Sequence, residues 1–274
     1  MVLGSLASIQ IGAAVATFLF DEIGSTGVVF LRALFAALIL VAIWRPSVRI
    51  PSHQRLLVIL FGISLSGISM ASYASIARIP LGVAMTLQFI GPLTVALITS
   101  HRRSDLIWAG MAAAGVLLLT GKIESGALDM TGVALSLVAG AFWGAYILIG
   151  TRLGGSSSGG SLLALAMVVS AVITMPPGIV SGGSDLLLPT VLAVGLAVGL
   201  LSAAIPFSLD FEAMRRLPSS VFGVMVSLEP AVAAVVGFVI LDQGVTVTEL
   251  VAISLVVCAS VGALRSGGMP APEH

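Results

Sequence analysis

The sequence predicts an all-α integral membrane protein with ten transmembrane helices, arranged as two inverted repeats of five helices each. Three observations lead to this prediction: the composition, the lengths of the apolar runs and a repeated proline pattern. Charged residues make up 9% of the 274 residues and hydrophobic residues 58%, and the mean hydropathy is +1.17. So few charged side chains cannot cover a globular surface in water, which excludes a soluble monomer.

The apolar runs have the length of membrane spans. A spanning helix needs about 20 apolar residues, because each residue rises ~1.5 Å and the hydrocarbon core is ~30 Å thick. This rule predicts spans at 2–20, 26–44, 56–77, 82–100, 106–121, 132–150, 161–180, 187–209, 221–241 and 247–264. The first lacks a basic flank, so we expect a retained helix rather than a signal peptide. Pro176 and Pro177 should end or kink the seventh span.

The distribution of basic residues predicts that both chain ends are cytoplasmic. The loops after the second, fourth, sixth and eighth spans, together with the C-terminal tail, hold Arg45, Arg49, Arg55, Arg102, Arg103, Arg152, Arg215, Arg216 and Arg265. The opposite loops hold only Arg78 and Lys122. Because cytoplasmic loops carry the excess of Arg and Lys, the first set marks the cytoplasmic face.

An internal repeat relates the two halves of the chain. The fourth and ninth spans both open with Arg-x-Pro, and each has another proline twelve residues later: Arg78, Pro80 and Pro92 against Arg216, Pro218 and Pro230. Chance similarity between apolar segments is the alternative, but the paired spacing favours duplication. We expect repeats at 1–122 and 130–265, followed by a disordered tail at 266–274. Five helices is an odd number, so the copies cross the membrane in opposite senses, as in alternating-access transporters.

The sequence resembles the EamA-type drug/metabolite transporter superfamily, and its second half is most similar to the threonine/homoserine exporter branch. The segments that carry the resemblance are 140–148 (GAFWGAYIL), 201–209 (LSAAIPFSL) and 216–231 (RLPSSVFGVMVSLEPA). The resemblance implies a secondary active exporter of small neutral amino acids such as threonine and homoserine. It also implies a multi-pass protein of the inner membrane, driven by a proton gradient.

Glu229 is the acidic residue placed deepest in a predicted span. It lies about ten residues into the ninth span, or ~15 Å from the cytoplasmic end. An ionised carboxylate there costs roughly 2.5–3.5 kcal/mol, so it should face a cavity or be protonated. It either binds a proton or an ammonium group, or it is a packing acid beside Pro230. The first interpretation is slightly favoured, because carboxylates inside membranes are rare.

The remaining charged candidates suggest structural roles. Those at the end of the eighth span and in the loop after it are expected to form an ion-pair network or gate: Asp210, Glu212, Arg215 and Arg216. Arg32, about two turns into the second span, is expected to extend outward toward Asp21 and Glu22. Binding of a substrate carboxylate is the less favoured role for Arg32.

Other polar and aromatic side chains are candidates for a substrate or proton pathway: Gln10, Tyr73, Gln88, Trp143, Tyr146, Ser202 and Ser227. An aromatic pair with a few hydrogen-bonding groups could bind a small amphiphilic solute. On the third span, Gly62, Ser66, Ser69 and Tyr73 share one helical face. Close helix packing is the default interpretation of that face, and a pathway lining is the alternative.

Several function classes find no support in the sequence. The formal net charge of zero gives no electrostatic basis for binding nucleic acid. The three histidines are too scattered for a metal site, the single lysine is not in a phosphate-binding loop, and we expect no cofactor. A membrane-embedded enzyme acting on a lipid-linked substrate would need a cluster of acid, base or metal-binding groups. The alternatives to an amino-acid exporter are therefore a broader metabolite exporter of the same superfamily and, from another class, such an enzyme.

Overall fold

The computed structural model describes residues 1–46, 52–99, 107–108, 110–115, 118, 129–153, 159–206, 209–210 and 225–266. Within these ranges the regular secondary structure is helical throughout, as the composition predicts. The expected fifth span, 106–121, is described only at 107–108, 110–115 and 118, and the expected tail after Ser266 lies outside these ranges. The assigned helices are α1 (Val2–Thr17), α2 (Phe20–Trp44), α3 (Ser52–Ile76), α4 (Leu81–Gln88), α5 (Ile90–Thr99), α7 (Met130–Leu153), α8 (Gly159–Gly182), η1 (Gly183–Leu187), α9 (Pro189–Gly199), η2 (Leu200–Ala204), α12 (Glu229–Leu241) and α13 (Val247–Ser266).

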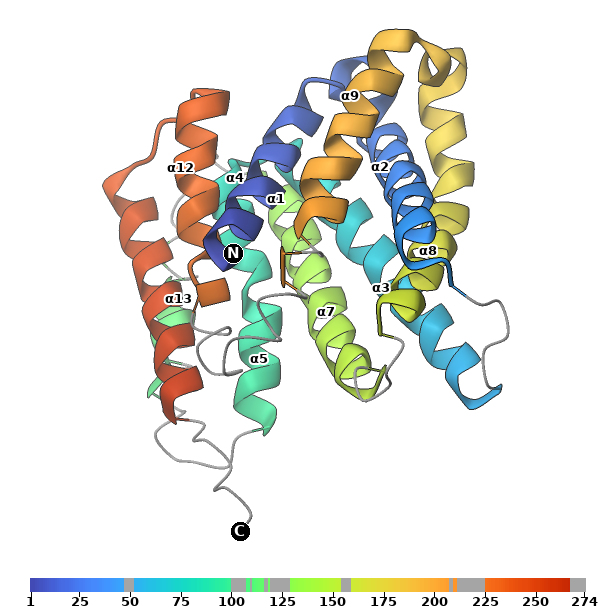
Figure 1. Ribbon diagram of the computed structural model, residues 1–274. Coiled ribbons are helices and arrows are strands. Elements are labelled where there is room, and N and C mark those ends of the chain that lie inside the picture. The colour runs from blue at the N-terminus through green and yellow to red at the C-terminus, as the bar shows by residue number, and fades with distance from the viewer. Residues whose placement is uncertain are drawn as a thin grey trace.

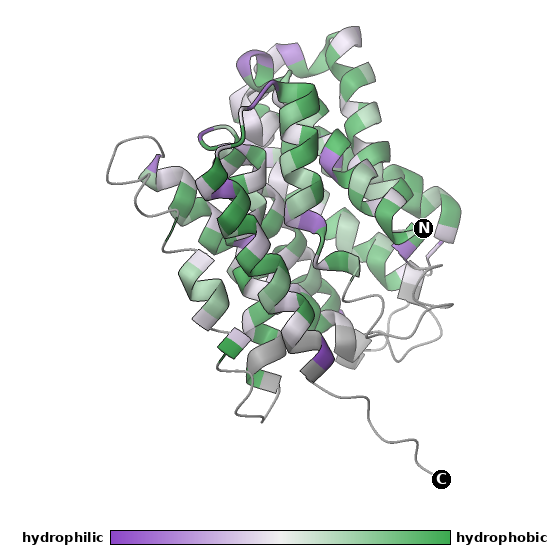
Figure 2. Ribbon diagram, turned by 90° about the vertical axis from the view of Figure 1, so that its left-hand side faces the viewer, coloured by the Kyte–Doolittle hydropathy of each residue, from purple (hydrophilic) through white to green (hydrophobic). Residues whose placement is uncertain are grey.

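Helix length and surface both fit a lipid environment. Among the described residues, four helices are long and apolar enough to cross a membrane: Phe20–Trp44, Gln54–Ile76, Met130–Gly150 and Gly160–Leu187. Large apolar side chains such as Val180, Val239 and Ile98 are more than two-thirds exposed, whereas Gln10 and Ser75 are fully buried. Figure 2 shows ribbons that are mostly hydrophobic along their length, with hydrophilic positions near the ends and at a few points inside. A surface of apolar side chains around buried polar ones is suited to the lipid of a bilayer rather than to water.

The first, second, fourth and eighth expected spans differ from the helices in the structure. Helix α1 ends at Thr17, and α2 already begins at Phe20, with Gly24 outside the helical region at φ 68° and ψ 164°. The fourth span is broken at Phe89 between α4 and α5. The eighth continues from α9 into a π-helical turn, η2. Hydropathy averages over a window and therefore could not detect these local interruptions.

Pro176 and Pro177 were expected to end or kink the seventh span, and the first of these effects does not occur, because α8 continues to Gly182. The φ of proline is compatible with a helix, so the energetic cost of a proline inside a helix comes from its missing N–H and from the clash of its ring with the preceding turn. Contacts with α2 hold the last turns in place: the Ser181 hydroxyl donates 2.9 Å to the carbonyl of Ile23. Tertiary packing therefore overrides the local signal.

The packing of the helices follows a crossed pattern between the two halves (Figure 1). Helix α2 packs along α8, and α3 packs along α7. Helix α1 contacts α12, while α7 contacts α4 and α5. The first helix of each half thus lies against the fourth span of the other half. Two inverted repeats related by a pseudo-two-fold axis produce this arrangement.

Small residues permit the closest of these contacts. A Cβ atom on Gly91 of α5 would overlap the carbonyl of Gly140 on α7, and one on Gly140 would meet the Gln88 carbonyl at 2.6 Å. Gly195 and Gly199 of α9 lie similarly against Leu31 and Phe35 of α2. The lack of a side chain at these glycines therefore allows the helices to approach closely.

Candidate functional site

Gln10 and Glu229 form a buried polar pair between the first helix and the broken ninth span. The Gln10 amide nitrogen donates 3.0 Å to Oε1 of Glu229. Gln10 is 0% exposed and Glu229 6% exposed. Glu229 lies in the first turn of α12, where the partial positive charge of the helix N-terminus favours an anion. The structure therefore brings together two residues that the sequence predicted only separately.

A second polar cluster surrounds Arg32. The Arg32 guanidinium donates from Nε to the Ser202 hydroxyl at 2.7 Å, from one terminal nitrogen to the Ser69 hydroxyl at 2.9 Å, and from the other to the Ser202 carbonyl at 3.0 Å. Its Cζ lies 5.9 Å from the centroid of the Tyr73 ring. The expectation that Arg32 extends outward toward Asp21 and Glu22 is wrong. The serines of α3 and η2 offer acceptors inside the helix bundle, which solvate the guanidinium locally.

Five buried side-chain polar atoms have no hydrogen-bond partner in the described structure, and three of them belong to residues that the sequence named as pathway candidates. These three atoms are Oε1 of Gln10, Nε2 of Gln88 and the hydroxyl of Tyr73. The other end of Gln88 is fixed, because its Oε1 accepts 2.6 Å from the hydroxyl of Ser72. Leaving a buried donor or acceptor unpaired is costly, so such atoms often await a ligand or water. All three belong to candidates that the sequence identified.

Trp143 and Tyr146 of α7 each contact a different aromatic side chain. The Trp143 ring makes an edge contact with Phe89 at 5.5 Å, at the break between α4 and α5. The Tyr146 ring stacks on Phe61 of α3 at 4.7 Å. Because α7 lies between α3 and the broken fourth span, two residues three positions apart contact different neighbours.

The expected gate is only partly described. Asp210 interacts electrostatically with Glu229 and with Tyr146, whereas Glu212, Arg215 and Arg216 lie outside the described residues. Ser227 is fully buried in the turn that precedes Glu229. Asp210 therefore belongs to the surroundings of Glu229.

The polar face of α3 divides into two parts. Gly62 lies against Ala166 and Val169 of α8, and the Ser66 hydroxyl bonds to that of Ser170 at 3.1 Å. These two residues pack helices together, as the default interpretation held. Ser69 and Tyr73 instead contact Arg32. Sequence reasoning missed Ser72, although a serine three positions after Ser69 lies on the same side of a helix.

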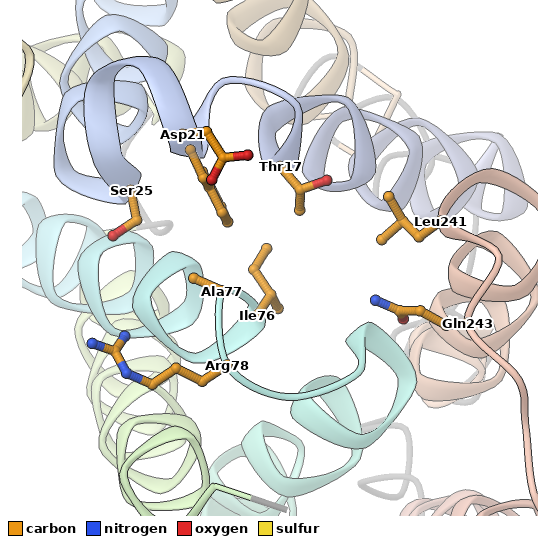
Figure 3. Close-up of a pocket in the computed structure, with 9 residues that line it drawn as sticks. Thr17, Asp21, Ser25, Ile76, Ala77, Arg78, Leu241 and Gln243 are labelled. Carbon is orange, nitrogen blue, oxygen red and sulfur yellow. The ribbon is translucent and has the colours of Figure 1, made fainter.

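A cavity of about 590 Å³ opens at one end of the bundle, where α1 meets α2 and α3 meets α4 (Figure 3). Its lining combines polar and apolar side chains: Thr17, Phe20, Asp21, Ser25, Ile76, Ala77, Arg78, Leu241 and Gln243. Gln243 also accepts 2.9 Å from the backbone N–H of Leu81, which ties the end of α12 to the start of α4. Phe20 links this cavity to the cluster around Arg32, because its ring lies 6.1 Å from that of Tyr73. No sequence signal had identified this opening.

Comparisons with known proteins agree with this architecture. Residues 130–265 match the model of the EamA-like transporter family. The threonine/homoserine exporter RhtA of Escherichia coli (strain K12) is 41% identical over 265 residues, which cover 96% of this chain and 89% of the relative. RhtA of Salmonella typhimurium (strain LT2) is 41% identical over 261 residues, with 94% and 88% covered. A solved crystal structure with 17% sequence identity covers 95% of both chains at a TM-score of 0.66, so the fold is shared.

Proposed function

Since this chain belongs to the EamA-like transporter family, we propose that it exports small neutral amino acids, in particular threonine and homoserine, in exchange for protons. The relatives named threonine/homoserine exporter support the substrate class, because they align over nearly the whole chain. The buried pair of Gln10 and Glu229 is the observation on which the coupling to protons rests.

The proposed repeats at 1–122 and 130–265 provide the two moving halves. Their fourth spans are interrupted at corresponding places: Phe89 precedes Pro92 by three residues, and Ser227 precedes Pro230 by three residues. Broken helices at the interface of inverted repeats typically surround the substrate site of secondary transporters. The crossed contacts of α1 with α12 and of α7 with α4 support the same division.

Glu229 can couple the two fluxes through competition for one carboxylate. A proton or the ammonium group of an amino acid can each neutralise the buried charge, but both cannot bind the same oxygens together. Gln10 holds one carboxylate oxygen and leaves its own Oε1 available as an acceptor for an ammonium group. Binding of a proton from one side therefore favours release of the substrate, which is the requirement for exchange.

We also propose the orientation that the basic residues predict, with both termini in the cytoplasm and the chain in the inner membrane. In this orientation the cavity lined by Thr17, Asp21 and Arg78 opens on the external side. The described structure would then present the exit side of the pathway to solvent.

Reconstituted vesicles test the proposed transport. The purified chain in liposomes should move labelled threonine and homoserine when a pH gradient is imposed, and protein-free liposomes provide the control. Movement that is independent of the gradient would remove the coupling to protons. If no amino acid moves, the broader metabolite exporter replaces the amino-acid exporter.

A further inference from the structure

Arg32 retains hydrogen-bonding capacity that the described protein does not use. A guanidinium has five N–H donors, and three of them bond to Ser202 and Ser69. The two unused N–H groups are on the terminal nitrogens, one on each. None of the bonded partners is a carboxylate, so hydroxyls and a carbonyl orient the guanidinium without neutralising it.

A second unused donor lies beside Arg32. The Tyr73 side chain is 5% exposed, and its hydroxyl has no hydrogen-bond partner in the described structure. Its ring lies 5.9 Å from the Cζ of Arg32. A fixed cation next to a buried, unpaired hydroxyl is a suitable receptor for a small anion with several acceptor atoms.

The receptor lies next to the opening of the bundle. Phe20 lines the cavity at the bundle end and also contacts the Tyr73 ring at 6.1 Å. Tyr73 therefore contacts both a residue that lines the cavity and the guanidinium. Arg32 itself is partly exposed, so a solute that passes the two rings could reach it.

We propose that Arg32, with the Tyr73 hydroxyl as a second donor, binds the carboxylate of the transported amino acid. This inference rests on the proposed function, and it deepens it by assigning the group that recognises the acid end of the substrate. Ser69 and Ser202 are positioning residues, because they orient the guanidinium. An alcohol or amide analogue without the carboxylate loses the charge-assisted bonds.

The test compares acids with their amides in vesicles that contain wild-type protein, R32Q or R32K. Unlabelled threonine should inhibit movement of labelled threonine by the wild type, and threonine amide should not. In R32Q we expect threonine movement to fall roughly 10–100-fold, the scale of lost charged hydrogen bonds, and the preference for acid over amide to disappear. R32K keeps the charge and should retain that preference, with weaker binding. R265Q, which changes an exposed arginine at the end of α13, is the matched control.

Y73F keeps the inference testable if R32Q does not fold. The substitution removes a hydroxyl that has no partner in the described structure, so the melting temperature should stay unchanged while the KM for threonine rises about 2–10-fold. An unchanged KM in Y73F would overturn the role of the hydroxyl. If R32Q, which has lost the charge, transports poorly but still prefers threonine over its amide, the role of the guanidinium is overturned.

If wild-type vesicles move neither threonine nor homoserine, the proposed function fails by itself, and a binding measurement tests the inference independently. Detergent-solubilised protein is heated with lactate, with threonine and with the amide of each. Stabilisation by an acid over its amide that is lost in R32Q supports the carboxylate site. Equal stabilisation of the wild type and R32Q, or none by either acid, overturns it.

Discussion

The Gln10 amide donates a 3.0 Å hydrogen bond to the carboxylate of Glu229, joining two residues that are 219 positions apart in the sequence. One residue belongs to the first helix of the first half, and the other begins α12 after the break in the ninth span. The contact therefore crosses the interface between the two proposed repeats. A change in the charge of Glu229 would act directly on that interface.

We predict that Glu229→Gln abolishes transport driven by a pH gradient but leaves exchange of labelled for unlabelled threonine. Glutamine has nearly the shape of glutamate and keeps the bond to Gln10, but it stays neutral at every pH. Vesicle assays with and without a gradient separate the two activities.

Glu22→Gln is the matched control for this substitution, because Glu22 is exposed at the start of α2. It should transport as the wild type does. If Glu229→Gln also transports normally at every pH, Glu229 is structural, and Asp210 or Glu212 becomes the next candidate for coupling.

A second prediction concerns the contact between α5 and α7. A methyl group on Gly91 would overlap the Gly140 carbonyl, and backbone cannot move aside as a side chain can. We expect Gly91→Ala to destabilise the protein by about 1–3 kcal/mol, the usual cost of overpacking, and to lower its melting temperature in detergent. Gly110→Ala has open space around the new Cβ and should be neutral or slightly stabilising. Equal melting temperatures for both variants would contradict the close approach.

Hydropathy was sufficient to predict an all-helical membrane fold, because it depends on composition along the chain, which the sequence states directly. The direction of Arg32 could not be predicted in this way, because it depends on how α2 is rotated relative to α3 and η2. Snorkelling is the common solution for an arginine near a helix end, but Ser69 and Ser202 provide a local one.

The breaks in the helices were also only partly predictable from the sequence. Pro92 and Pro230 marked the fourth and ninth spans as special, and both breaks occur three residues earlier. Pro176 and Pro177 gave the same local signal, yet α8 continues through them. What differs is the packing around each segment, which a single sequence does not reveal.

The topology prediction is tested by reporter fusions. Fusions at Ser47 and Gly155 should give a cytoplasmic signal, and one at Glu124 should give an external signal, because most arginines lie in the first set of loops. A cytoplasmic signal at Glu124 would reverse the orientation and contradict the odd number of spans in each repeat.

The last prediction concerns the break in α2 at Gly24. Its φ of 68° and ψ of 164° belong to a region that is essentially restricted to glycine, and a Cβ there would overlap the hydroxyl of Ser181. We expect Gly24→Ala to cost about 1–3 kcal/mol from the backbone alone. Gly183 also has a positive φ, of 51°, but open space surrounds it, so Gly183→Ala should cost only about 1–2 kcal/mol. The melting temperatures of Gly24→Ala, Gly183→Ala and the double variant Gly24→Ala/Ser181→Ala separate the cost of the backbone conformation from that of the overlap. If the second substitution restores full stability, the overlap rather than the backbone conformation makes glycine necessary at this break.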